Sequence, residues 1–274
     1  MRYLITGHKG QLGRALQRRL PEAVGIDLPE VDICDPVAFG RVMAAERPDL
    51  IWHCAAMTDV DGAARDPALA YRINGLGTQN VALAAAKAGA ALVYISTNEV
   101  FDGARQTPYF EFDTPNPLNA YARSKLAGEW FATHLLSRFY VVRTAWLSAA
   151  GGRNFVHRIL QLADEHGSLR VVTDEVANPS FVEDLTSALL TLIASERFGL
   201  YHLTNAGYCS RYEFARKVLE LSGRSHVRLE PITLADYPRA STPPPFAPLA
   251  NTAAAALGIV LRPWEEALEE FLKS

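Results

Sequence analysis

Short apolar runs alternate with amphipathic or alanine-rich stretches along much of the chain. The apolar runs predict β-strands at residues 3–6, 23–26, 50–54, 91–95, 140–144 and 200–203. Apolar positions spaced three and four residues apart predict helices between the strands, among them residues 14–20 and 78–90. This alternation is typical of an α/β fold, in which a Rossmann-type, doubly wound parallel sheet has helices on both faces.

The alternation weakens from Ala149 onward, and the proline-dense residues 242–248 cannot belong to regular structure. Near the end, residues 262–272 predict a capped amphipathic helix with Pro263 in its first turn. We therefore expect a Rossmann domain and a smaller, mainly C-terminal lobe. The predicted domain spans residues 1–147 and is completed by a strand near 199–206, and the predicted lobe spans residues 148–198 and 207–274.

Charge and composition exclude several classes of protein. A net charge of −3 gives no sign of a surface for nucleic acid or lipid. The three cysteines are odd in number and lack metal-ligand spacing, so free thiols are expected. No apolar run reaches the roughly 18 residues of a membrane span, and no charged and apolar leader precedes the first strand. A cytoplasmic protein without membrane or nucleic-acid partners is expected.

Three glycines follow the first predicted strand at a regular spacing. Gly7, Gly10 and Gly13 lie between residues 3–6 and a helical stretch. Glycines at such a junction permit a tight turn, close approach to a pyrophosphate and close packing of helix on strand. An ordinary strand-helix turn is the alternative.

Asp27 favours the dinucleotide interpretation. It ends the second predicted strand, near the position of a carboxylate that binds the adenosine ribose. A carboxylate accepts from a ribose 2′-hydroxyl and repels a 2′-phosphate, so NADH is slightly favoured over NADPH. Lys9 and Arg14 weaken this preference, since either is close enough in sequence to reach a phosphate.

Tyr121 and Lys125 are separated by one helical turn in Tyr121-Ala-Arg-Ser-Lys125. A free phenol has a pKa of about 10, and an adjacent ammonium group is expected to bring it toward neutrality. Such a pair suits proton transfer, and the lysine can also hold a ribose hydroxyl. An isolated pair with this spacing arises easily by chance, so its weight depends on the glycine turn.

Further candidates lie where strands are expected to end, because ligands of doubly wound sheets bind there. The hydroxyl of Thr97 is placed to bond a substrate oxygen or to satisfy a local turn. Ala55 and Ala56 are small enough to admit a cofactor, although small residues also serve packing. Asn74 either bonds backbone near the site or is a helix-side amide. Trp146 either stacks on a base or sugar or packs in the core.

Together, the glycine turn, Ser96-Thr97 and Tyr121-x-x-x-Lys125 resemble an extended short-chain dehydrogenase/reductase. Within that group the chain is similar to the dTDP-4-dehydrorhamnose reductase family over nearly its full length. The resemblance rests on the contexts Ile5-Thr-Gly-His-Lys-Gly-Gln-Leu-Gly13, Val100-Phe-Asp-Gly103, Asn116-Pro-Leu-Asn119, Lys125-Leu-Ala-Gly-Glu129, Arg143-Thr-Ala-Trp146, Gly152-Arg-Asn-Phe155 and Leu261-Arg-Pro-Trp264.

The resemblance implies reduction of the 4-keto group of dTDP-6-deoxy-L-lyxo-hexos-4-ulose by NAD(P)H, giving dTDP-L-rhamnose for polysaccharide biosynthesis. Its catalytic residues would be Thr97, Tyr121 and Lys125. The residues implied to bind the cofactor are Gly7, Gly10, Gln11, Leu12, Gly13, Asp27, Asp32, Ile33, Ala55, Ala56, Met57, Tyr121 and Lys125. Those implied to bind the nucleotide sugar are Thr97, Asn98, Glu99, Trp146 and Asn154. A homodimer is one option for the assembly.

Three departures from the family pattern concern the substrate and the metal. Asn98-Glu99 replaces the usual Asp-Tyr, which suggests a different substrate floor. Residues 243–249 lack an arginine that the resemblance would place near the diphosphate. Ala15 stands where some members have a magnesium-binding glutamate, so magnesium is doubtful and no metal is expected.

Two rival functions remain open. Thr97-Asn98-Glu99-Val100-Phe101 is similar to the signature of sugar-nucleotide 4,6-dehydratases, with asparagine in place of aspartate. Asparagine cannot donate the proton that expels a hydroxyl, but Glu99 could act as a base in a lyase or epimerase. A non-catalytic NAD(P)-binding subunit is the other rival, and the retained Thr97, Tyr121 and Lys125 argue against it.

Overall fold

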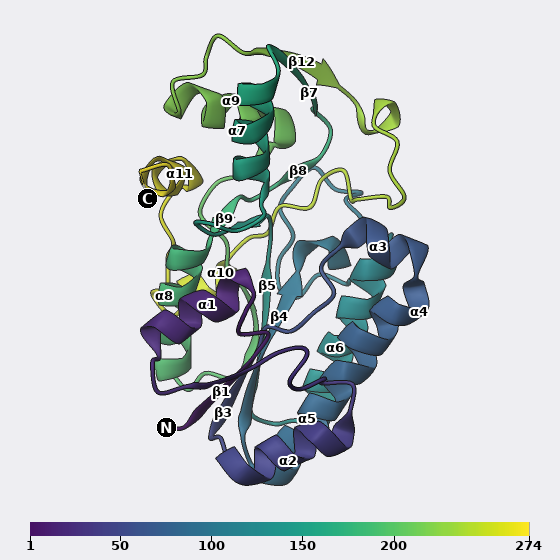
Figure 1. The fold of residues 1–274 in the computed structure, drawn as a ribbon, viewed down its shortest axis with the longest axis vertical. Helices are drawn as coiled ribbons and strands as arrows, with labels where there is room; N and C mark the ends of the chain where they lie inside the picture. Colours follow the sequence, from purple (N-terminus) through teal and green to yellow (C-terminus); the bar gives the residue numbers. More distant parts are fainter. Residues whose placement is uncertain (274) are drawn as a thin grey trace.

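The computed structural model describes residues 1–273, and its centre is a six-stranded parallel sheet (Figure 1). The strands lie in the order β10-β5-β4-β3-β1-β2. Their bounds are Tyr3–Thr6 (β1), Val24–Ile26 (β2), Leu50–His53 (β3), Ala91–Thr97 (β4), Phe139–Thr144 (β5) and Gly199–His202 (β10). The order reverses between β1 and β3, so the predicted doubly wound sheet is confirmed and its switch point lies between these two strands.

Helices cover both faces of the sheet (Figure 1). On one face, α1 and α8 pack with the strands in a core that also includes residues 254–261. On the other face lie α2, α5 and α6, whose small residues, such as Ala82 and Ala85, are fully buried against the strands. The helices of this part are α1 (Gln11–Arg19), α2 (Pro36–Glu46), α3 (Val60–Arg65), α4 (Pro67–Ala70), the π-helix η1 (Tyr71–Gly77), α5 (Thr78–Ala88), the 3₁₀-helix η2 (Asn98–Val100), α6 (Ala120–Leu135), α8 (Val182–Ala194) and α10 (Thr252–Ala255).

A second core lies beyond the carboxyl ends of the strands (Figure 1). It is formed by α7, α9 and α11, with Phe214 fully buried among them. The helices are α7 (Phe155–Glu165), α9 (Arg211–Leu221), α11 (Trp264–Phe271) and the 3₁₀-helix η3 (Leu234–Asp236). Short strands complete it, namely β6 (Leu147–Ser148) with β9 (Ser180–Phe181), β7 (Ser168–Val172) with β12 (Arg228–Ile232), and β8 (Val176–Ala177) with β11 (Cys209–Ser210).

Three features differ from the expectations in detail. Helix α8 falls within the predicted lobe, yet Leu185 and Leu189 are buried in the core of the sheet. Strand β4 extends two residues further than predicted, so Ser96 and Thr97 end the strand instead of following it. Helix α11 begins after Pro263, which occupies the N-cap position without a side-chain cap. The domain division stays a prediction, and we propose to place α8 and α10 on its sheet side.

The described residues include neither a membrane-spanning helix nor a cluster of metal ligands. Within residues 1–273, no helix is both long and apolar enough to cross a membrane. The same residues contain no group of three or more His, Cys, Asp or Glu side chains arranged to hold a metal ion.

Candidate functional site

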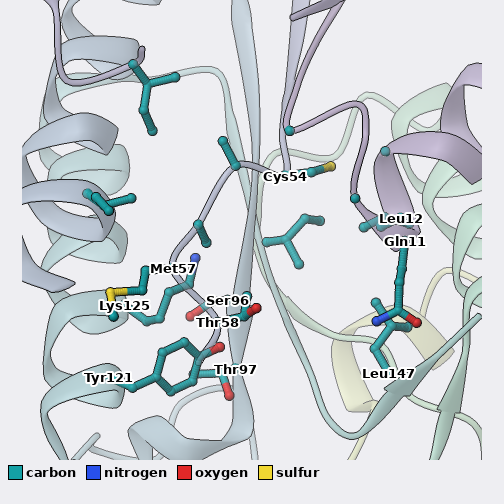
Figure 2. A pocket seen from close by; sticks show the side chains of 18 of the residues that line it. Gln11, Leu12, Cys54, Met57, Thr58, Ser96, Thr97, Tyr121, Lys125 and Leu147 are labelled. Carbon is teal, nitrogen blue, oxygen red and sulfur yellow. The ribbon is translucent and has the colours of Figure 1, made fainter. Parts of the chain in front are cut away.

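A cavity of about 820 Å³ opens at the switch point, beyond the carboxyl ends of the central strands. It brings together residues that are far apart in the sequence (Figure 2). Of the predicted site residues, those that line it are Gly7, Gly10, Gln11, Leu12, Gly13, Asp27, Asp32, Ile33, Ala55, Ala56, Met57, Thr97, Asn98, Glu99, Tyr121, Lys125 and Trp146. The strand ends and the helix starts therefore meet where a ligand is expected.

Each glycine of the turn at residues 7–13 allows a different close approach that a side chain would hinder. Gly7 has a φ of +69°, and a Cβ there would approach Ala55 N to 2.6 Å. A Cβ at Gly13 would lie 2.2 Å from Gly7 O, so this glycine permits close packing of helix on turn. A Cβ at Gly10 would meet only Gly7 O, at 3.2 Å. The chain itself fills no space in front of Gly10, which fits the approach of a pyrophosphate.

Helix α1 begins directly at this turn and has no side-chain cap. Its first turn contains no acidic residue, so the free N–H groups and the helix dipole present a positive end to the cavity. The side chain of Gln11 is occupied elsewhere, since its Oε1 accepts from Ala149 N at 3.0 Å. Its Nε2 donates to Arg153 O at 3.5 Å.

Asp27 lies at the end of the cavity formed by the β2 strand. Its carboxylate oxygens accept from the backbone N–H groups of Lys9 and Leu28, both at 2.9 Å. The Lys9 ammonium group is paired instead with Glu30, at 2.7 Å, and also donates to Leu28 O. Neither Lys9 nor Arg14 lines the cavity, whereas Arg72 and Arg153 are cations that do.

Asn74 fixes the chain that follows β3. It lies in the π-helix η1, a form of helix often found at functional sites. Its Oδ1 accepts from Met57 N at 2.8 Å, and its Nδ2 donates to Met57 O and to Ser124 Oγ. Of the two interpretations left open for this residue, bonding to backbone near the site is the one observed. The side chain thereby joins the cavity wall to α6.

Thr97, Tyr121 and Lys125 lie together on one wall of the cavity, with Gln11 and Leu12 on the opposite wall (Figure 2). Tyr121 and Lys125 come from the first two turns of α6, which Asn119 caps by accepting from Ala122 N at 2.8 Å. The Lys125 ammonium nitrogen lies 4.1 Å from the centre of the Tyr94 ring. Such a cation-π contact stabilises the charge of a lysine in an apolar wall.

The protonation states differ from the expected ones. Burial raises the pKa of Tyr121, and the charge of Glu99 raises it further, while a hydrogen bond with Thr97 lowers it. The expected lowering of the phenol pKa by its lysine neighbour is therefore not found. Burial lowers the pKa of Lys125 to about 7, against the opposing charge of Glu129. A protonated phenol is the form that donates a proton to a carbonyl oxygen.

Asn98 and Glu99 have different surroundings although they are adjacent. The Asn98 amide is buried and donates to Ala247 O at 3.1 Å, so it anchors the proline-dense segment. Glu99 accepts from Asn119 Nδ2 at 2.7 Å through Oε2. Burial raises the pKa of the Glu99 carboxyl, and the Asn119 hydrogen bond opposes this rise.

Trp146 separates the first cavity from a second one of about 510 Å³. One face of its ring is packed, because the Arg211 guanidinium carbon lies 3.7 Å from the ring centre. The second cavity has an aromatic and basic lining that includes Trp146, Phe155, Arg158, Arg170, Glu175, Arg211, Tyr237 and Arg239. Four arginines against one glutamate make this lining cationic. Trp146 packs against the second core, as one of its two interpretations has it, and its stacking on a base or sugar stays a prediction.

Asn154 is the predicted site residue that lines neither cavity. It is the N-cap of α7, because its Oδ1 accepts from His157 N at 3.1 Å and its Nδ2 donates to Ala149 O at 2.8 Å. The motif around it thus has a structural role here. Arg72 and Thr58 line the first cavity and belong to none of the motifs found in the sequence. Arg153 also lines it and lies in the Gly152-Arg-Asn-Phe155 context, but it was not among the predicted site residues.

Comparisons with known proteins agree with this geometry. The model of the family described as RmlD substrate binding domain matches residues 1–274. The chain belongs to this family. A dTDP-4-dehydrorhamnose reductase of Mycobacterium tuberculosis is 39% identical to this RmlD family member, over 97% of the chain and 91% of the relative. The spore coat polysaccharide biosynthesis protein SpsK of Bacillus subtilis is 36% identical, over 98% of the chain and 96% of the relative.

Solved structures give the same assignment. A dTDP-4-dehydrorhamnose reductase of Bacillus anthracis, solved in complex with NADP, superposes with a TM-score of 0.95 at 38% identity. The match covers 99% of this RmlD family chain and 98% of the other. The predicted membership of the dTDP-4-dehydrorhamnose reductase family is therefore confirmed, together with its Rossmann-type fold.

Proposed function

We propose that this protein is an NAD(P)H-dependent reductase of a nucleotide-activated 4-keto deoxysugar, and that it converts dTDP-4-dehydrorhamnose to dTDP-L-rhamnose. The observation with most weight is the convergence of Thr97, Tyr121 and Lys125 in the cavity that also receives the glycine turn and the uncapped start of α1. The names of full-length relatives that are 36–39% identical support the substrate.

The residues fit a nicotinamide dinucleotide along the floor of the cavity. Gly10 and the first N–H groups of α1 would hold the pyrophosphate, and Asp27 would hold the adenosine ribose. A bound nicotinamide supplies the hydride. Tyr121 would then donate its phenolic proton to the C4 oxygen of the sugar, while the hydroxyl of Thr97 bonds the same oxygen. Lys125 would hold the nicotinamide ribose and stabilise the phenolate that forms when Tyr121 has given up its proton.

The cationic second cavity supports binding of the nucleotide diphosphate end of the substrate, which stays attached to the sugar during the reduction. Arg158, Arg170 and Arg239 line it, and guanidinium groups suit phosphate oxygens because their donors form a planar fork. Trp146 borders both cavities, so a sugar in the first would connect to a diphosphate in the second. Arg170 and Arg239 are paired with Glu230 and Asp61, whereas Arg158 forms no ion pair within residues 1–273. Arg158 would therefore supply the positive charge that residues 243–249 lack.

We further propose that NADH serves at least as well as NADPH. Asp27 lines the cavity, and a carboxylate at the adenosine ribose would repel a 2′-phosphate, while Lys9 is paired with Glu30. Arg72 is the cation that would oppose this preference. Such a biosynthetic reductase would act in the cytoplasm.

A substrate panel tests the proposal. The protein is incubated with NADH or NADPH and each of several nucleotide-linked 4-keto-6-deoxy sugars, and the absorbance of the reduced nicotinamide is followed together with the sugar product. We expect one NAD(P)H to be oxidised per sugar reduced, fastest with the dTDP-linked L-lyxo substrate. Sugar conversion without net NAD(P)H oxidation would instead show a lyase or epimerase, which regenerates its cofactor within each turnover.

A further inference from the structure

One carboxylate oxygen in the catalytic wall lacks a partner. Glu99 lies in the short helix η2, directly after the strand that ends in Thr97, and it lines the same cavity as Tyr121. Its Oε2 accepts from Asn119 Nδ2 at 2.7 Å. No residue of the described chain, 1–273, donates to Oε1. An acceptor in a cavity wall gains most from a donor that enters with the ligand.

Asn119 fixes the direction of this carboxylate. Its Oδ1 caps α6 through Ala122 N, and its Nδ2 donates both to Glu99 and to Thr242 O, the latter at 3.1 Å. All its hydrogen-bonding groups are therefore in use. Because Asn119 also begins the helix that carries Tyr121, the Glu99 carboxylate is held in a fixed relation to the phenol.

The chemistry of the substrate indicates which donor is nearest to this oxygen. In a 4-keto-6-deoxy sugar, the carbons next to the carbonyl are C3, with a hydroxyl group, and C5, with a methyl group. If Tyr121 faces the carbonyl oxygen, the hydroxyl on C3 is the nearest donor that the sugar offers to the same wall.

We propose that Oε1 of Glu99 accepts a hydrogen bond from the sugar hydroxyl next to the reacting carbonyl, and that it thereby selects substrates bearing this hydroxyl. The inference rests on the proposed function. The role requires no proton transfer, which separates it from a base in epimerase or lyase chemistry.

The other charged groups near Glu99 agree with an acceptor role. Arg239 and Arg211 favour its ionised form, whereas burial and the neighbouring Glu175 oppose it. Arg211 is itself paired with Glu175 at 2.9 Å, and Arg239 with Asp61 at 3.2 Å. The two arginines are thus bound to other carboxylates, and Oε1 stays available for the ligand.

A cycle of two proteins and two substrates tests the proposal. Wild type and Glu99→Gln are each assayed with the 4-keto sugar nucleotide and with its 3-deoxy analogue, and kcat and KM are measured separately. Since the Asn119 amide can only donate toward position 99, the glutamine would turn its oxygen to Asn119 and its amino group to the sugar. The substitution therefore keeps the bond to Asn119 and replaces the acceptor in the cavity with a donor.

We expect Glu99→Gln to lower kcat/KM for the hydroxylated sugar by about 10- to 100-fold, mainly through KM. The two proteins should use the 3-deoxy analogue equally, within about threefold, because neither then makes the bond. Glu183→Gln, an exposed substitution on α8, is the matched control and should change neither substrate.

If Glu99→Gln lowers kcat/KM equally for both sugars, the proposal is overturned. If it lowers kcat for both sugars, the proposal is also overturned, because Glu99 would then be a proton-transfer group. Wild-type protein that reduces no 4-keto sugar would overturn the proposed function itself, and the inference with it. If the wild type reduces the 4-keto sugar but Glu99→Gln loses the same activity with both sugars, the inference alone is overturned and the proposed function stands.

Discussion

The buried ion pair beneath the catalytic helix permits a quantitative prediction. Glu129 and Arg143 have side chains that are only 5% and 3% exposed. The carboxylate accepts from Arg143 Nε at 2.9 Å and Nη2 at 2.7 Å, and Ser96 donates its hydroxyl to the same group. We predict that Glu129→Gln destabilises the protein strongly, because it leaves the guanidinium group without its counter-charge.

Removal of one partner of a buried pair costs about 3–5 kcal/mol. For a chain of this size, each kcal/mol lowers Tm by about 2–4 °C, so the variant should melt about 6–20 °C lower. The assay is urea and thermal unfolding followed by circular dichroism. The double variant Glu129→Met with Arg143→Met should recover at least half of the loss, since apolar residues of similar size leave no charge buried.

An exposed pair supplies the control. Glu183 pairs with Arg18, and both side chains are 61% exposed, so Glu183→Gln should cost below about 1 kcal/mol. If Glu129→Gln costs no more than this control, the guanidinium group reaches water or another anion when unpaired, and the reasoning is refuted. A double variant that is less stable than the single one would also refute it, because the loss would then come from packing.

Three further predictions concern the site. Tyr121→Phe removes the proton donor, so kcat should fall by about 10²- to 10⁴-fold while cofactor affinity, measured by titration, stays near that of the wild type. Asp27→Ala should shift the ratio of kcat/KM values toward NADPH, and a wild type that strongly prefers NADPH would contradict the role given to Asp27. The third prediction concerns stability between pH 7 and pH 10. The folded pKa of Lys125 is lowered to about 7, below the unfolded value of about 10.4, so the unfolded chain binds more protons in this window. Between pH 7 and pH 10 the free energy of unfolding should therefore rise more steeply in the wild type than in Lys125→Met. Denaturant midpoints measured across this window test the difference.

The first half of the fold could be predicted from the sequence because its elements have local signals. The buried strands are short apolar runs, and three glycines mark a turn whose geometry excludes a Cβ at Gly7 and Gly13. The spacing of Tyr121 and Lys125 follows from one helical repeat. These signals depend on neighbours in the chain, so no tertiary information was needed to find them.

The remaining features depend on contacts between distant residues. An apolar stripe on α8 shows that the helix packs on something, but not that its partner is α1 and the sheet. The paired strands β7 and β12 are separated by two helices, α8 and α9, and four strands. Most other strands of this part have two residues, too few for a periodic pattern. Asn154 shows a different limit, because the family motif around it indicates a binding residue without revealing that its side chain caps a helix, and its contact with the substrate stays a prediction.

Helix α6 connects catalysis with stability through residues spaced four apart. Tyr121 lines the cavity, Lys125 lies deeper against the Tyr94 ring, and Glu129 is buried with Arg143. Burial drives Lys125 toward its neutral form, whereas the charge of Glu129 favours the cation. A lysine that must stabilise a phenolate has to remain charged, so the buried pair one turn further along should also affect turnover. Glu129→Gln removes the charge that favours the lysine cation, so it should lower the pKa of Lys125. The limb of the pH-rate profile that depends on this lysine should therefore move to lower pH.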